Sequence, residues 1–173
     1  RWYFLICLSV MVGCGTLAGI ATSRDAGWAE VFMSPAFRQR LEQFMQEQET
    51  PGEYFGDTAD MFGGWGFAGF LMTHNIKVAL TCFALGPTFG LGTLYVLAVN
   101  SLMIGSFLGL GALNGKLLVM GAVVVPHGII ELSAILLASA AGLRFGYALI
   151  NPGDLRRGDA LMIAGHQSVR LAV

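Results

Sequence analysis

Charged side chains are scarce in this sequence, and their scarcity limits what the protein can be. Only 12% of the 173 residues are Asp, Glu, Lys or Arg, whereas soluble domains carry about 25%. Apolar residues make up 55%, more than a water-soluble core of this length could bury, so lipid must cover part of the chain. The net charge of −1 argues against nucleic acid as a partner.

Motifs of catalysis and of cofactor binding are also missing. The sequence contains no nucleophile elbow, no Walker A loop and no HExxH motif, so we expect neither an enzyme nor a cofactor. Cys7, Cys14 and Cys82 all lie in apolar runs and lack the spacing of metal ligands. We interpret them as free thiols that pack as small hydrophobic side chains.

Long apolar runs dominate the sequence instead. A helix needs about 20 predominantly apolar residues to cross a bilayer. The runs predict one all-α membrane domain over residues 1–173, a polytopic transmembrane helix bundle with spans at about 2–21, 75–98, 99–114 and 117–146. A further helix is expected to start within 160–173. Because the first run begins at once and the last has barely started, we expect a longer chain at both ends.

The region between the first two spans predicts two other elements. Ser34-Pro35 is a typical helix start, since proline fits the first helical position. An apolar face then recurs at helical spacing, made of Phe37, Leu41, Phe44 and Met45. This amphipathic helix would lie on the membrane surface or over the mouth of the bundle. The Gly- and aromatic-rich residues 61–73 are too short a run to cross and predict a re-entrant half-helix.

Basic residues indicate the orientation. Arg144, Arg156 and Arg157 flank the end of the last long span, and the excess of positive charge places that end in the cytoplasm. Counting back through four crossings puts Arg1 inside and the amphipathic helix outside. We therefore expect a multi-pass protein of the bacterial inner (plasma) membrane with an extracytoplasmic amphipathic helix.

Three residues inside the longest apolar run form a candidate intramembrane polar site. His127 and Glu131 are four apart and share one face of a helix, and Pro126 frees the carbonyl of Ala122. An ionisable group at this depth costs at least a few kcal/mol without a partner or water. One interpretation is an ion or proton site; the other is a hydrogen-bonded clamp to a neighbouring helix. A metal centre would need a further ligand such as His74, and we expect none.

Two further groups of residues are candidates for supporting roles. His74, Asn75 and Lys77 form a polar cluster where we expect the second span to begin, with Asn75 capping that helix and Lys77 reaching the interface. Small residues at small-xxx-small spacing, and polar residues within the spans, predict close helix packing. These packing residues are Gly86, Gly90, Gly92, Thr93, Asn100, Gly105, Gly109 and Gly142.

The sequence resembles the stage II sporulation protein M family. The resemblance covers about residues 67–157, and its most specific element is a His-Gly-x-x-Glu pattern after a proline, at the right distance from a Gly-x-Gly-Thr run. The matching segments are 74–80, 83–86, 90–97, 126–132 and 141–144, with Asn100 and Gly105. Ser101 departs from the glycine that usually follows the asparagine. The resemblance implies a polytopic membrane protein, whose namesake holds peptidoglycan-degrading partners at the septal membrane during engulfment.

Two functions remain open from the sequence. The first is a non-enzymatic scaffold or subunit of a membrane complex, which would bind other membrane or periplasmic proteins and form an oligomer or hetero-complex in the lipid bilayer. The second is a transporter or channel subunit with its polar site around His127 and Glu131. A scaffold needs the polar pair to hold helices together, whereas a transporter needs it to line a wet cavity.

Overall fold

The computed structural model describes residues 1–35, 38–39, 41–42, 65–153 and 155–172. Throughout this part the regular structure is helical, without strands. The helices are α1 (Trp2–Arg24), α2 (Gly27–Phe32), α5 (Trp65–Ala84), α6 (Leu91–Leu113), α7 (Leu117–Ile150) and α8 (Arg157–Ala172). Among the described residues, three helices are long and apolar enough to cross a membrane: α1, α6 and the Gly128–Ile150 part of α7. The predicted all-α membrane bundle is confirmed.

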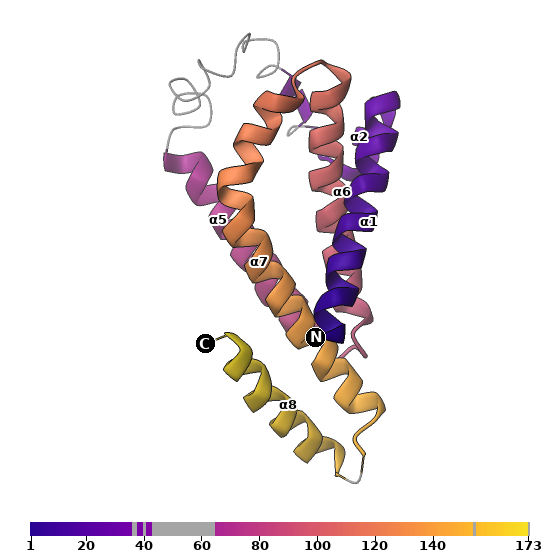
Figure 1. The fold of residues 1–173 in the computed structure, drawn as a ribbon, viewed down its shortest axis with the longest axis vertical. Helices are drawn as coiled ribbons and strands as arrows, with labels where there is room; N and C mark the ends of the chain where they lie inside the picture. The colour runs from indigo at the N-terminus through magenta and orange to yellow at the C-terminus, as the bar shows by residue number, and fades with distance from the viewer. Residues whose placement is uncertain (36–37, 40, 43–64, 154, 173) are drawn as a thin grey trace.

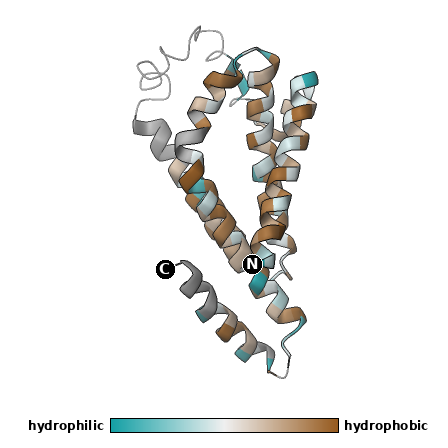
Figure 2. Ribbon diagram, in the orientation of Figure 1, coloured by the Kyte–Doolittle hydropathy of each residue, from teal (hydrophilic) through white to brown (hydrophobic). Residues whose placement is uncertain are grey.

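The four long helices associate as two pairs. α1 lies along α6 and α5 lies along α7, and within each pair the helices run in the same direction (Figure 1). The two pairs run in opposite directions, so the chain reverses at each connection of α5, α6 and α7. Hydrophobic residues cover most of both pairs, while the hydrophilic ones gather at helix ends and on α8 (Figure 2).

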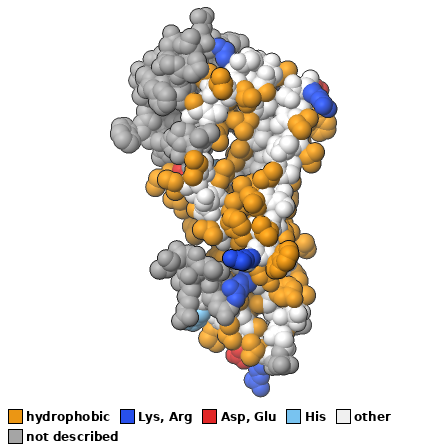
Figure 3. Space-filling view, in the orientation of Figure 1, with side chains coloured by type: hydrophobic (Ala, Val, Ile, Leu, Met, Phe, Trp, Pro, Cys, Tyr) orange, Lys and Arg blue, Asp and Glu red, His pale blue; other side chains and the backbone are white. Residues whose placement is uncertain are grey.

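The outer surface of this bundle is apolar. Leu17 of α1 and Tyr95 of α6 are each 70% exposed, and Ile130 of α7 is 77% exposed. Figure 3 shows such hydrophobic side chains over the whole length of the described helices on one face. A surface of this kind is unfavourable in water but matches the hydrocarbon of a bilayer.

Helix α7 is longer than a bilayer requires. Its 34 residues correspond to about 51 Å, against about 30 Å for the hydrocarbon core. In Figure 1 the helix bends away from α6 in its first half and returns to the bundle in its second half. Pro126 lies in the first half of α7, and proline removes one hydrogen bond and bends a helix. After Ile150 the chain reverses, and α8 folds back against the end of α7.

The predicted boundary between the second and third spans is wrong. The structure ends α5 at Ala84 and starts α6 at Leu91, so residues 75–98 are not one helix and 99–114 is not a separate one. Phe89 and Gly90 have φ of 58° and 79°, a left-handed conformation that a helix cannot continue through. Pro87 adds a residue without a backbone N–H. Because apolar residues flank this turn on both sides, the break between the two helices is not apparent from the sequence.

The expected helix start at Asn75 is wrong. Residues 65–74 already form the first half of α5, so the expected half-helix is continuous with the helix that follows; residues 61–64 lie outside the described part. Asn100 and Ser101 are buried in the middle of α6. The Ser101 hydroxyl donates to the carbonyl of Leu97 at 2.6 Å, which satisfies it within the helix.

The amphipathic helix falls mostly outside the described residues, including Phe37, Phe44 and Met45. Positions 35, 38–39 and 41–42 are helical, and Leu41 is buried. Leu41 belongs to an apolar cluster with residues from α2 and from the connected ends of α6 and α7: Ala29, Met33, Leu110, Val119 and Met120. This segment therefore covers the end of the bundle at the α6–α7 connection.

Candidate functional site

A polar contact joins α5 to α7 in the middle of the bundle. The Asn75 side chain donates a hydrogen bond from Nδ2 to Oε2 of Glu131, and both side chains are half-buried. Sequence spacing paired Glu131 with His127 on the same helix, whereas the structure provides a partner from another helix. The side chains of Pro126 and His127 lie outside the described residues. The contact is a hydrogen bond to a carboxylate, one of the stronger kinds in proteins.

The other two members of the polar cluster at residues 74–77 have different surroundings. His74 is half-buried and also interacts with another group in the structure. Lys77 is exposed, and its backbone carbonyl accepts a hydrogen bond from the Thr81 hydroxyl at 2.7 Å. Of this cluster, Asn75 is thus the residue that the structure brings to Glu131.

Glycines bring α1 and α6 into backbone contact. A Cβ atom on Gly105 would lie 2.0 Å from the carbonyl oxygen of Gly15, and one on Gly109 would lie 2.6 Å from that of Gly19. Only glycine permits this approach, which maximises van der Waals contact where lipid offers no hydrophobic driving force. A buried hydrogen bond from Thr22 Oγ1 to Ser106 Oγ, at 3.2 Å, supports the same interface.

Sequence reasoning selected Gly105 and Gly109 but missed their partners Gly15 and Gly19. The missed pair has the same small-xxx-small spacing, so the signal was present in the first apolar run. A spacing within one helix does not say which other helix it meets, so the pairing of Gly15 and Gly19 with α6 depends on the tertiary structure.

A second close approach occurs where α5, α6 and α7 meet. A Cβ on Gly142 would lie 2.5 Å from the carbonyl oxygen of Cys82 and 2.8 Å from the hydroxyl of Thr93. That hydroxyl donates to the same Cys82 carbonyl at 2.7 Å, which ties the start of α6 to the end of α5. The predicted packing residues Thr93 of α6 and Gly142 of α7 therefore lie against one another, beside the Cys82 carbonyl of α5.

The turn between α5 and α6 lies against α7. A Cβ on Gly86 would be 2.5 Å from the carbonyl oxygen of Gly142, and one on Gly146 would be 2.4 Å from the nitrogen of Gly90. Gly92, also a predicted packing residue, lies in the first turn of α6 and donates its N–H to the hydroxyl of Thr88 in the α5–α6 turn at 2.9 Å. The turn is therefore stabilised by contacts between segments that lie far apart in the sequence.

One buried polar group has no hydrogen-bond partner among the described residues, and a second lies beside a thiol. The first is Nδ2 of Asn100, whose residue is 5% exposed, and the second is Oγ of the fully buried Ser139, which lies beside Cys82. Asn100 follows Thr93 by seven residues on α6 and therefore shares its face. Buried polar groups of this kind are rare in folded proteins and often mark functional positions.

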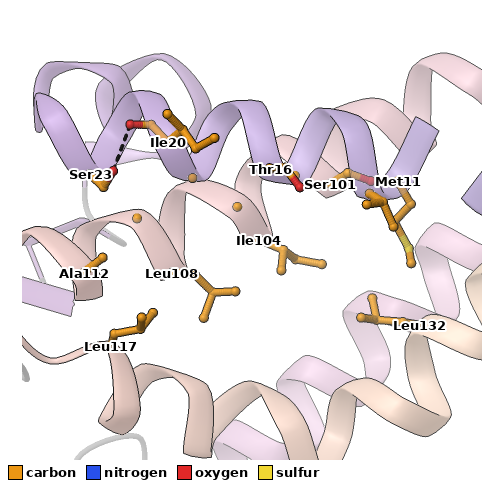
Figure 4. A pocket seen from close by; sticks show the side chains of 15 residues that line it. Met11, Thr16, Ile20, Ser23, Ser101, Ile104, Leu108, Ala112, Leu117 and Leu132 are labelled. Carbon is orange, nitrogen blue, oxygen red and sulfur yellow. Dashed lines mark hydrogen bonds between the residues drawn. The ribbon is translucent and has the colours of Figure 1, made fainter. Parts of the chain in front are cut away.

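An apolar groove lies between α1, α6 and α7. Its volume is about 450 Å³, and its lining includes Met11 and Ile20 of α1, Ile104 and Leu108 of α6, and Leu132 of α7 (Figure 4). Among the residues whose side chains the structure describes, none that lines it is ionisable. The glycines of the α1–α6 interface form part of its floor. We call it the α1–α6–α7 groove.

Two ion pairs lie on α2 and the segment that follows it. Arg38 forms ion pairs with Glu30 and, from Nε at 2.7 Å, with Glu42. The hydrogen bonds from Glu42 and from Glu30 raise the pKa of Arg38 above its ordinary value. Within the described part of the chain, no three His, Cys, Asp or Glu side chains gather closely enough to hold a metal ion.

An apolar outer surface, glycine-to-glycine helix contacts and interhelical hydrogen bonds together define an all-α membrane protein. The profile described as Stage II sporulation protein M matches residues 4–173, nearly the whole chain. The chain belongs to the stage II sporulation protein M family, and the resemblance read from residues 67–157 is confirmed.

A relative and the solved structures add little to this assignment. Over 78 residues the chain is 36% identical to a protein of Methanocaldococcus jannaschii that is described only as uncharacterized. The aligned stretch spans 44% of this chain and 44% of that protein, less than half of each. No solved structure is significantly similar to the chain.

Proposed function

We propose that this protein is a non-enzymatic scaffold or subunit of a membrane complex in the plasma membrane of a bacterial cell. The observation that supports the proposal most is the use of polar groups inside the bundle. Asn75 binds Glu131, Thr22 binds Ser106, and Thr93 binds the backbone of α5. These groups join helices of the same chain, which is what a rigid framework requires.

The partners would be other membrane or periplasmic proteins, in an oligomer or hetero-complex. Two surfaces suit them: the exposed apolar faces of the long helices, and the peripheral segment after α2 with its Arg38 ion pairs. On the orientation inferred from the basic residues, this segment lies outside the cytoplasm. Apolar contacts within the bilayer would thus hold a partner at the membrane, and charges outside the bilayer would orient that partner.

Site-specific photo-crosslinking in native membranes tests the proposal. A photoreactive residue in place of Trp28, which is 49% exposed on α2, is expected to crosslink to other proteins. The same residue in place of Leu97, which is fully buried, is the matched control and should give no intermolecular product. A chain that is recovered alone, without products from Trp28 or from exposed positions on α1, α6 and α7, would reject a scaffold.

Transport is the rival function, and one specific observation favours it. Asn100 presents a buried amide nitrogen without a partner among the described residues, as a path for water or ions would. If the protein transports, Glu131→Gln should change ion flux in liposomes, whereas Glu30→Gln, on the exposed surface of α2, should not. Wild-type liposomes without flux of protons, Na⁺ or K⁺ would remove this function.

A further inference from the structure

The α1–α6–α7 groove is too narrow for a protein helix. It follows α1 from Met11 to Ser23, which is about 18 Å of helix. The groove has a volume of about 450 Å³. An α-helix of the same length, at least about 10 Å wide with its side chains, would occupy roughly 1,400 Å³.

The same dimensions suit a hydrocarbon chain. Carbon atoms pack at about 3.5–4 Å, so a single alkyl chain occupies a cross-section of roughly 15–20 Å². One leaflet contributes about 15 Å of the roughly 30 Å hydrocarbon core, close to the length of the groove. The lining is apolar, and Val12, Ile20 and Leu117 are each about half exposed, so the groove opens at the protein surface.

The charge at one end of the groove identifies the kind of lipid. Ser23 and Leu117 line that end (Figure 4), and Arg24 follows Ser23 directly as an exposed residue in the last turn of α1. The neighbouring Asp25 accepts a hydrogen bond from the backbone N–H of Gly27 at 2.8 Å. A guanidinium beside an apolar groove at a helix end is complementary to a phosphate at the membrane interface.

We propose that the α1–α6–α7 groove binds one acyl chain of an anionic phospholipid, whose phosphate lies at Arg24. The lipid fills the space between the α1–α6 pair and the bent half of α7. It comes from the leaflet on the side of the α6–α7 connection. This site is independent of the proposed scaffold function, since it concerns neither the partners nor the polar contacts.

Native mass spectrometry of the purified chain tests the site. The protein is delipidated and then offered phosphatidylglycerol or phosphatidylcholine with identical acyl chains. We expect one retained lipid per chain, with phosphatidylglycerol bound about fivefold more tightly. Equal retention of the two lipids, or none of either, would overturn the proposal. A second copy of the chain on this face in place of a lipid would also overturn it.

Variants separate the acyl site from the charged end. Ile104→Trp places a large side chain in the groove and is expected to weaken lipid retention about tenfold. Val99→Trp is the matched control, because Val99 is 45% exposed on the same helix and does not line the groove. Arg24→Gln should remove the preference for phosphatidylglycerol without abolishing binding of a single lipid.

A second groove variant distinguishes the loss of the lipid site from a folding defect. Leu132→Trp fills the same space from α7, and its melting temperature in detergent is measured together with that of Ile104→Trp. Loss of lipid in both variants, with melting temperatures near that of Val99→Trp, supports the site. Full lipid retention in both filled variants would refute it, because an occupied groove cannot also hold an acyl chain.

Discussion

The α1–α6 interface and the middle of the α5–α7 interface are held together by different physical means. Backbone contact at Gly15, Gly19, Gly105 and Gly109 joins the first, with a hydroxyl pair beside it. The carboxylate of Glu131 and an amide from α5 join the middle of the second, and a close approach of α7 to α5 occurs towards the end of α5. Close packing fails steeply when an atom is added, whereas a polar contact fails when one partner is removed. These two interfaces should therefore respond to opposite kinds of mutation.

Adding one methyl group to the α1–α6 interface should have the largest effect. The Cβ of Gly105→Ala would lie 2.0 Å from a backbone oxygen that cannot move without shifting α1. We expect a loss of about 3 kcal/mol or more of stability, measured by unfolding in detergent micelles. Gly13→Ala is the control on α1, because nothing lies within 4 Å of its Cβ. If both variants melted alike, close packing would not hold this pair.

Removing a partner from the α5–α7 contact should have a smaller effect. Glu131→Ala leaves the Asn75 amide half-buried without its acceptor, and we expect a loss of about 1–2 kcal/mol in the same assay. Glu131→Gln keeps an acceptor and should lose less. The double variant Asn75→Leu with Glu131→Leu should lose less than the sum of its single variants. Additive losses would show that the two side chains act separately.

The hydroxyl pair of the α1–α6 interface should contribute less still. Thr22→Val keeps the shape of the side chain and removes the hydrogen bond to Ser106, so we expect a loss of about 0.6 kcal/mol. Ser23→Ala is the comparison, because the Ser23 hydroxyl bonds only to Ile20 of its own helix, at 2.9 Å. A loss as large as that of Gly105→Ala would mean that polar contacts dominate both pairs.

The ion pairs of Arg38 lie outside both helix pairs, and their loss should have the smallest effect on stability. Arg38→Gln is expected to cost less than about 1 kcal/mol, because Glu30 and Glu42 are solvent-exposed. The difference between wild type and variant should shrink as salt is raised, since exposed charges are screened. Unfolding at low and at high salt measures this difference in stability. A difference that does not change with salt would contradict an exposed ion pair.

The sequence predicted the long elements well and their connections poorly. The spans predicted at 2–21 and 117–146 correspond in position to α1 and α7, because each is a mainly apolar run bounded by polar residues, although His127 and Glu131 interrupt the second. The turn between α5 and α6 was missed, because its glycines and proline also occur inside membrane helices. Its conformation depends on contacts with Gly142 and Gly146, which lie more than fifty residues away in the sequence.

The candidate site was predicted only in part. Glu131 stood out because an acid within an apolar run needs a partner, and Asn75 stood out as a polar residue beside another run. Spacing alone paired Glu131 with His127 and gave Asn75 a capping role, since helical periodicity reports only neighbours on one helix. The contact between the two required the packing of α5 against α7.

Composition and apolar runs were enough to determine the solvent and the class of this protein: too little charge for water, and runs long enough for lipid. The tertiary structure decided which glycines meet, which amide reaches the carboxylate of Glu131, and where the α1–α6–α7 groove lies. The physical reason is that the two kinds of property depend on residues at different separations along the chain. Solvent preference adds up residue by residue along the chain, whereas close packing depends on pairs of surfaces that only folding brings together.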